Sequence, residues 1–205
     1  MYRPAHFDVA EIAQIHDIID SAVLAHLVVA AGESLESTPL PMLLDRDAGP
    51  FGTLTGHLAR PNPLSKQAVG GQQALAIFAG PDAYISPSYY GSKQEDGKVV
   101  PTWNYTVVHA HGELTVHDDP VWVEALVRRL TERHEGARPV PWSVDDAPAD
   151  YIKGLMKRIV GIELRITRLE GKRKLSQNKP EDLDGIIVAL EAGTPGETAV
   201  ARSMR

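Results

Sequence analysis

The spacing of apolar residues along this 205-residue chain changes from a helical period to an alternating one and back. Near the N-terminus, apolar side chains recur every three or four positions, which predicts an amphipathic helix over residues 7–24 with Asp8 as its cap. The apolar positions that share one face of this helix are Ile12, Ile15, Ile19 and Val23. Short apolar or alternating runs between turn residues then predict strands over residues 27–31, 37–44, 52–58, 74–80, 83–86, 102–116 and 162–169.

Further helices are predicted between and after these strands, over residues 62–69, 119–135, 149–158 and 180–190. Asn62 is the expected cap of the first of them. Strands that follow one another without regular helical crossovers favour an antiparallel sheet or barrel over a doubly wound fold. We therefore expect a mainly β protein with flanking helices, of the α+β class. A chain of this length builds one good core, so residues 1–191 are predicted to form a single domain with helical insertions. Residues 192–205 carry no core pattern and are predicted to be a disordered tail.

The stretch from Thr102 to Tyr105 puts a hydroxyl, an indole, an amide and a phenol in four consecutive positions. Because neighbouring side chains on a strand point to opposite faces, Thr102 and Asn104 should share one face, and Trp103 and Tyr105 the other. Such a strand end offers hydrogen bonds on one side and flat aromatic surface on the other, which suits a planar ligand with polar edges. The alternative is an aromatic-rich strand that only packs into a core.

The charge distribution argues against some classes of function. The chain holds 21 basic and 27 acidic residues, a net charge of −6, which disfavours broad electrostatic attraction to DNA or anionic lipid. Basic residues concentrate in residues 165–179, where six of them accompany one acid, Glu170. No apolar run approaches the ~20 residues that span a bilayer, and the first residues do not read as a signal peptide. Since there is also no cysteine, we expect a cytoplasmic protein without disulfides or thiolate chemistry.

Two further groups of residues could carry chemistry. In the segment from His57 to Pro63, a predicted strand ends and a predicted helix begins. The free N–H groups at the start of this helix and the guanidinium of Arg60 could together bind a phosphate. The alternative is a capped helix with an arginine on the surface. His109 and His111 lie two apart on a strand and hence on one face, where imidazoles can bind a metal. His117 is the one candidate for a third ligand nearby, so we favour a structural or interface role for the pair.

Protein-borne catalytic patterns are missing from the sequence. It has no GxGxxG or GxxxxGK[ST] motif, no GxSxG around Ser86 or Ser88, and no recognisable triad of nucleophile, base and orienting residue. Whether the protein is an enzyme therefore stays open at this point. If it is one, a bound cofactor must carry the chemistry.

Segments around the central strand resemble a known family. Pro101–Tyr105 (PTWNY) and Val107–Gly112 (VVHAHG) are similar to the PaiB family of FMN-binding negative transcriptional regulators. Four more segments fit this family in the same order: Met1–Pro4 (MYRP), Gly56–Pro63 (GHLARPNP), Tyr84–Tyr90 (YISPSYY) and Gly171–Asn178 (GKRKLSQN). Tyr89 stands where the family pattern has tryptophan, which keeps the position aromatic.

The resemblance implies an antiparallel FMN-binding split β-barrel in a homodimer with two flavins at the subunit interface. It assigns the FMN phosphate to His57, Arg60 and Asn62. The expected contacts of the flavin are Thr102, Trp103, Asn104, Lys174, Ser176 and Gln177. The resemblance further implies negative transcriptional regulation, with DNA or a regulatory protein as an indirect partner and no membrane. A flavin-dependent oxidoreductase or flavin reductase on the same fold is the alternative, since fold does not decide function.

Overall fold

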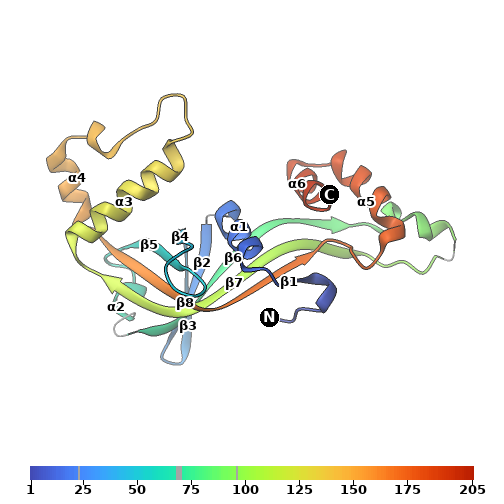
Figure 1. Cartoon of the computed structure of the whole chain (residues 1–205), viewed down its shortest axis with the longest axis horizontal. Coiled ribbons are helices and arrows are strands. Elements are labelled where there is room, and N and C mark those ends of the chain that lie inside the picture. The colour runs from blue at the N-terminus through green and yellow to red at the C-terminus, as the bar shows by residue number, and fades with distance from the viewer. Residues whose placement is uncertain (23, 68–70, 96) are drawn as a thin grey trace. The chain divides into compact units, whose positions relative to one another are not determined.

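The structure is a computed structural model that describes residues 1–22, 24–67, 71–95 and 97–205 (Figure 1). Its strands are β1 (Asp8–Val9), β2 (Leu24–Ala31), β3 (Ser34–Pro41), β4 (Leu43–Asp45), β5 (Thr53–Ala59), β6 (Gln72–Ile85), β7 (Thr102–His117) and β8 (Ile159–Lys174). Its α-helices are α1 (Ile12–Ala22), α2 (Leu64–Gln67), α3 (Pro120–Glu135), α4 (Ala149–Met156), α5 (Leu183–Glu191) and α6 (Pro195–Ser203). Short 3-10 helices are η1 (Ala5–Phe7), η2 (Pro87–Tyr89), η3 (Gly91–Gln94), η4 (Val144–Asp146) and η5 (Pro180–Asp182).

Within the described residues, the strands form one eight-stranded sheet in the order β3-β2-β6-β7-β8-β5-β4, and β1 pairs with β8. The pairs β1–β8, β2–β3, β4–β5 and β5–β8 are antiparallel. An antiparallel sheet with flanking helices is the α+β arrangement that the sequence predicts, and this prediction is confirmed. In the same part of the chain, no helix has both the length and the apolar character that crossing a membrane requires.

The chain divides into two compact units. Unit 1 comprises Met1–Ala22, Phe78–His109 and Glu170–Arg205, and unit 2 comprises Val23–Ile77 and Ala110–Leu169. The division falls inside the three long strands β6, β7 and β8, so each unit contains a part of each of them.

The core of unit 2 includes the pairing of β5 with β8, whose register runs from Thr53 opposite Arg165 to Ala59 opposite Ile159. The apolar side chains that these strands bury in the core include Leu54, Leu58, Ile162 and Leu164. α3 packs against β5, and its buried residues are Val123, Leu126 and Leu130. This helix was predicted to begin at Asp119, which caps it: the Asp119 carboxylate accepts a 3.0 Å hydrogen bond from the N–H of Val121.

The core of unit 1 joins the end of β6 to the two C-terminal helices. Its buried members are Ala83, Ile85, Tyr90, Leu175, Ile186, Leu190, Val200 and Ala201. α6 begins with a capping box, in which the hydroxyl of Thr194 accepts from the N–H of Glu197 at 3.3 Å and the Glu197 carboxylate accepts from the N–H of Thr194 at 2.7 Å. The prediction that residues 192–205 form a disordered tail is therefore wrong. Packing against α5 stabilises the helix α6, whose few apolar residues give no clear helical pattern in the sequence.

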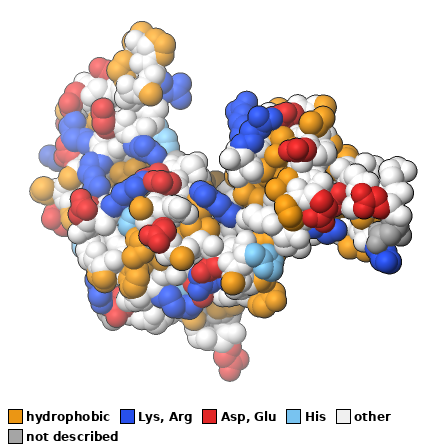
Figure 2. Space-filling model, turned by 45° about the vertical axis from the view of Figure 1, so that its right-hand side comes forward, with side chains coloured by type: hydrophobic (Ala, Val, Ile, Leu, Met, Phe, Trp, Pro, Cys, Tyr) orange, Lys and Arg blue, Asp and Glu red, His pale blue; other side chains and the backbone are white. Residues whose placement is uncertain are grey.

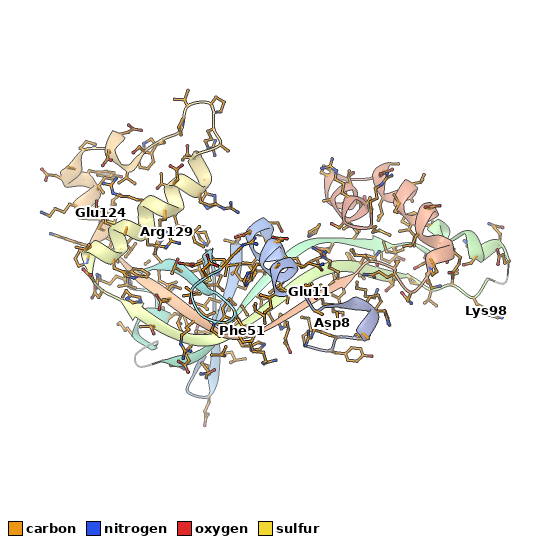
Figure 3. All side chains as sticks on the ribbon, in the orientation of Figure 1. Asp8, Glu11, Phe51, Lys98, Glu124 and Arg129 are labelled. Atoms are coloured by element: carbon orange, nitrogen blue, oxygen red, sulfur yellow. The ribbon has the colours of Figure 1, made fainter. Side chains whose placement is uncertain are left out.

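The N-terminal helix begins later than the sequence predicts. α1 starts at Ile12, whereas Asp8 lies in β1, opposite Lys172 of β8 (Figure 3). An ion pair with Arg3 also engages the Asp8 carboxylate. The expected cap is therefore wrong, because pairing with β8 extends the backbone where the helix was expected to start. The apolar face is only partly confirmed, since Ile12 is 40% exposed and Val23 lies outside the described residues.

Other element boundaries also differ from the prediction. The two runs predicted over residues 74–80 and 83–86 form the single strand β6, in which a Cβ at Gly80 would stand 3.1 Å from the Cβ of Thr106 on β7. β8 extends to Lys174, so the basic segment is mostly strand rather than loop. The helix predicted over residues 62–69 is observed as α2, which ends at Gln67, and residues 68–70 lie outside the described part.

Candidate functional site

The nine residues that the sequence assigns to FMN fall into two groups, one in each unit. The phosphate-end residues, His57, Arg60 and Asn62, belong to unit 2. The ring-end residues, Thr102, Trp103, Asn104, Lys174, Ser176 and Gln177, belong to unit 1. The ring-end group brings side chains of distant sequence segments together within its unit, whereas the phosphate-end residues all come from one short segment.

Lys174 joins the end of β8 to the start of β7. Its ammonium donates hydrogen bonds to the hydroxyl of Thr102 at 2.6 Å and to the carbonyl oxygen of Trp103 at 2.5 Å. An ammonium has three N–H donors, of which these bonds use two. Burial, and then the neighbouring charge of Lys172, lowers the pKa of Lys174. Three of the predicted ring-end residues thus form one polar cluster around a half-buried cation.

Asn104 and Ser176 form a reciprocal hydrogen-bonded pair in the interior of unit 1. The Asn104 amide Nδ2 donates to the Ser176 hydroxyl at 3.0 Å, and this hydroxyl donates to Oδ1 of Asn104 at 3.1 Å. Both side chains are buried. Ser176 has a φ of 63°, a left-handed conformation that costs a residue other than glycine roughly 1–2 kcal/mol. The pair therefore helps to hold a strained turn, whatever further contact it makes with a ligand.

Gln177 follows this turn and is exposed. Its Oε1 accepts a hydrogen bond from the N–H of Leu175 at 2.7 Å, and its Nε2 donates to the carbonyl oxygen of Arg173 at 2.7 Å. Both ends of the amide thereby bind the backbone of the turn itself. A contact between Gln177 and the flavin stays a prediction.

The face of β7 opposite Asn104 carries aromatic rings that reach solvent. Trp103 is 53% exposed and Tyr84 of β6 is 45% exposed, and their ring centroids lie 5.8 Å apart in an edge-to-face arrangement. The alternation predicted for this strand is confirmed, because Asn104 is buried and Trp103 is not. An exposed aromatic surface of this kind suits stacking with a planar ligand or packing against a second protein surface.

Arg60 is held by several acceptors of unit 2. Its guanidinium forms a bidentate ion pair with Asp118, at 2.7 Å and 2.6 Å, and donates to the carbonyl oxygens of Lys157 at 2.9 Å and Ile159 at 3.1 Å. Hydrogen bonding within the pair raises the pKa of Arg60 and lowers that of Asp118. The bound carboxylate shows that the guanidinium accommodates an oxyanion, so a phosphate fits it chemically but must replace or share Asp118.

Asn62 is the predicted cap of α2. Its Oδ1 accepts from the N–H of Leu64 at 3.0 Å, and its Nδ2 donates to the hydroxyl of Thr38 at 3.2 Å. His57 lies on β5, and its Nδ1 is buried without a hydrogen-bond partner in the described part of the chain. Burial lowers the pKa of His57. An orphaned nitrogen on the strand that leads to Arg60 fits a ligand that supplies the missing partner.

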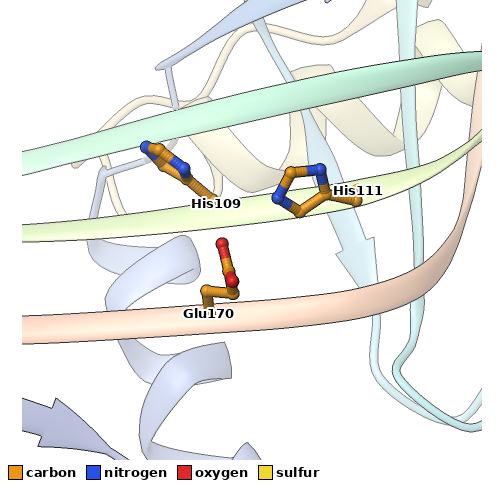
Figure 4. Close-up of side chains that lie close together, drawn as sticks. All are labelled: His109, His111 and Glu170. Carbon is orange, nitrogen blue, oxygen red and sulfur yellow. The ribbon is translucent and has the colours of Figure 1, made fainter. Parts of the chain in front are cut away.

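Glu170 is the candidate that the sequence interpretation missed. Figure 4 shows Glu170 of β8 and His109 of β7 on neighbouring strands, and their possible ligand atoms lie within 4.8 Å of one another. The Glu170 carboxylate also forms a 2.9 Å ion pair with the amino group of Met1, which a metal ion would have to displace. The sequence does single out Glu170, because it is the one acidic residue beside six basic residues in residues 165–179.

His117, the one candidate for a third metal ligand beside His109 and His111, makes other contacts. His117 stacks on Trp122 at a centroid distance of 4.1 Å and lies 3.7 Å from the carboxylate of Glu163, all within unit 2. These contacts are those of a structural histidine. The structural or interface role predicted for His109 and His111 therefore stays a prediction.

Comparison with known proteins places these residues in a family. A family model described as "Putative FMN-binding domain" matches residues 1–168. The chain is similar to an uncharacterized protein of Aspergillus fumigatus, with 36% identity over 83% of this chain and 82% of that protein. It is also similar to the protease synthase and sporulation protein PAI 2 of Bacillus subtilis, with 29% identity over 93% of this chain and 89% of that protein.

Among solved structures, the flavocytochrome Anf3 from Azotobacter vinelandii has a similar fold. It superposes with a TM-score of 0.60 at 16% sequence identity, over 85% of this chain and 72% of that one. At this identity the likeness concerns the fold alone. It confirms the split barrel that the sequence predicts.

Proposed function

Because this chain belongs to the PaiB-like family of FMN-binding proteins, with FMN as its cofactor, we propose that it acts as an FMN-dependent negative regulator of transcription. The observation that carries the flavin part is the ring-end cluster of unit 1, where the half-buried Lys174 ammonium binds the backbone of the exposed Trp103. An isoalloxazine ring needs flat apolar surface and donors toward its carbonyl oxygens and N5, which these two residues supply. Bound FMN would contribute the redox-active ring, and the side chains would bind and orient it.

The proposed working form is a homodimer. The rings of Trp103 and Tyr84 are exposed in the single chain, and a second copy offers one way to cover them. The phosphate-end and ring-end residues could then come from either protomer. Light scattering at micromolar concentration tests this, and a mass near the 22.3 kDa of one chain would contradict it.

The regulation is proposed to be indirect. In the basic segment, Lys172 is buried, Lys174 is engaged within unit 1, and Arg165 forms a 2.5 Å ion pair with Glu113 in unit 2. The face drawn in Figure 2 carries basic and acidic side chains intermixed. The basic segment thus offers few cations to phosphates, and the net charge is −6, so a gel shift at physiological salt should need a partner protein. Tight binding of the purified protein to one DNA sequence, with a steep salt dependence, would refute this.

Two substitutions test the assigned ends of the flavin. Arg60→Ala removes a charge-assisted contact worth about 1.5–3 kcal/mol, which corresponds to a roughly 10- to 150-fold loss of FMN affinity. Riboflavin lacks the phosphate, so its affinity should change little. Lys174→Met should weaken FMN and riboflavin alike, because the ring is common to both. Fluorescence titration of each variant with each flavin gives the four affinities.

Asp118→Asn is the matched control, since it frees the guanidinium of Arg60 without removing it. This variant should bind FMN at least as tightly as the unmodified protein. An equal loss of FMN and riboflavin in Arg60→Ala would show that Arg60 does not contact the phosphate. Unchanged titrations of Lys174→Met would remove the ring-end cluster from the site.

A flavin-dependent oxidoreductase or flavin reductase is the second candidate function, and the Lys174 cation favours it. A positive charge beside the ring stabilises the anionic reduced flavin, so Lys174→Met should lower the midpoint potential. Adding NADH or NADPH and monitoring reduction of the bound flavin by its absorbance distinguishes the two functions. Steady turnover would support the enzyme, and bound flavin without turnover would support the regulator.

A further inference from the structure

Unit 2 contains a partly open cavity of about 660 Å³ lined by residues of α3, η4, α4 and the start of β8. α3 and α4 lie side by side in this unit (Figure 1). The volume falls within the roughly 300–1,000 Å³ that is usual for small-molecule sites. Among the residues assigned to FMN, Arg60 lines the cavity, and its guanidinium already binds Asp118. The other residues of the lining are not assigned to FMN, so the cavity is a candidate for a ligand other than the flavin.

The apolar wall of this cavity is incompletely covered by protein. Ile152 and Met156 stand four positions apart on α4 and so share one face, which lines the cavity. Both side chains are only half-buried, and no described residue of α4 is fully buried. Across the cavity, Val123 and Val144 are buried and complete an apolar surface. An apolar ligand body would remove the exposed part of this face from water.

The acidic residues of the lining are already paired. Asp118 binds Arg60, and Asp145 forms a bidentate ion pair with Arg128 at 2.8 Å and 2.9 Å. Glu124, which projects from α3 (Figure 3), accepts from the same Arg128 guanidinium at 2.9 Å and 3.1 Å. Each carboxylate of the lining thus has a cationic partner. None of them is left to bind a cationic ligand without giving up an existing ion pair.

Two cations of the lining have no such partner. Lys153 and Lys157 lie on the exposed side of α4 and its end, and neither ammonium forms an ion pair with any described residue. The lining holds two arginines, two lysines and three carboxylates, so it carries a net charge of +1 next to an apolar wall. We propose that this cavity binds a small molecule with an apolar body and one carboxylate, whose body covers Ile152 and Met156. Its carboxylate faces the two lysines.

The proposal goes beyond FMN binding, and it is tested on the FMN-saturated protein. Isothermal titration with decanoate, decanol and decylamine, each below its micelle-forming concentration, compares three head groups on one apolar body. Decanoate should bind most tightly and decylamine most weakly. Exposed ion pairs contribute about 0.2–1 kcal/mol each, so Lys153→Glu/Lys157→Glu should weaken decanoate roughly 2- to 30-fold. Decanol binding should stay within twofold, and Lys93→Glu, an exposed lysine of unit 1, should leave all three titrations unchanged.

The apolar wall has its own variants. Ile152→Asp should weaken decanoate and decanol together, and Met156→Gln serves the same purpose if circular dichroism shows that Ile152→Asp does not fold. Absence of decanoate binding, equal binding of decylamine, or an unchanged decanoate affinity in the double lysine variant would each overturn the proposal. Competition between FMN and decanoate would also overturn it, because the cavity would then belong to the flavin site. Flavin fluorescence, measured in parallel, shows separately whether FMN itself binds.

Discussion

The hydrogen-bonded pair of Asn104 and Ser176 allows a sharp test of how unit 1 is held together. The Asn104 side chain is fully buried, and it exchanges two hydrogen bonds with a Ser176 hydroxyl that is itself buried. Asn104→Ala removes these bonds, whose net contribution is about 0.5–1.5 kcal/mol each. It also leaves the Ser176 hydroxyl without its partner, at a cost of about 1–3 kcal/mol. We expect the free energy of unfolding to fall by roughly 2–4 kcal/mol, the larger sum being reduced by local relaxation.

The double-mutant cycle separates the pair from its surroundings. Ser176→Ala keeps the left-handed φ of 63° and its strain, so it should lose only the hydrogen bonds and leave Oδ1 of Asn104 unsatisfied, while Nδ2 keeps its 3.8 Å contact with the sulfur of Met204. The double variant removes both polar groups and leaves neither of them unpartnered. Its unfolding free energy should therefore lie close to that of Asn104→Ala alone, which gives a coupling of about 1–3 kcal/mol.

Urea unfolding of the four proteins, extrapolated linearly to zero denaturant, measures this coupling. Gln177→Ala is the matched control, because it removes an exposed amide from the same turn and should cost less than about 1 kcal/mol. The reasoning would be refuted if the two single effects simply added, to within about 0.5 kcal/mol. FMN titration of the same variants shows whether the pair also contributes to the flavin site.

Two further predictions concern unit 2. Burial lowers the pKa of His57 from its ordinary 6.5, so its contribution to stability should be complete above about pH 6.5 and be lost as the pH falls from there through the folded-state pKa. His57→Gln should flatten this dependence in urea unfolding between about pH 5 and 8, and parallel curves would contradict the assignment. Gly161→Ala places a Cβ 2.1 Å from the ring of Trp122. Thermal unfolding should therefore show that the free energy of unfolding falls by about 1–3 kcal/mol or more. Gly154→Ala on α4, where a Cβ meets nothing within 4 Å, is its control; it should be neutral or stabilising by up to about 1 kcal/mol, and equal losses in both variants would rule out the steric explanation.

Local sequence patterns determined much of this protein. The alternation from Thr102 onward predicted which side chains of β7 are buried, because the two faces of a strand are set by the backbone itself. Asn62 was predicted as a cap and Asp119 as the start of a helix, since the start of a helix depends on residues within a few positions of it. The antiparallel α+β class followed from the order of strands and helices. The family segments, which lie in order along the chain, predicted the FMN cofactor and the split barrel.

Tertiary structure alone decided which distant residues meet. Asn104 and Ser176 are 72 positions apart, and so are Thr102 and Lys174; no local pattern identifies either partner. The pairing of β1 with β8 extended the chain where a helix cap was expected, and burial of Val200 and Ala201 ordered a segment that reads as a tail. Arg60 was predicted to bind the FMN phosphate, but the fold brings its guanidinium to the carboxylate of Asp118, 58 positions away in the sequence. The physical reason is the same in each case: local propensity sets the form of an element, whereas the partner of each polar or apolar group depends on which elements pack beside it.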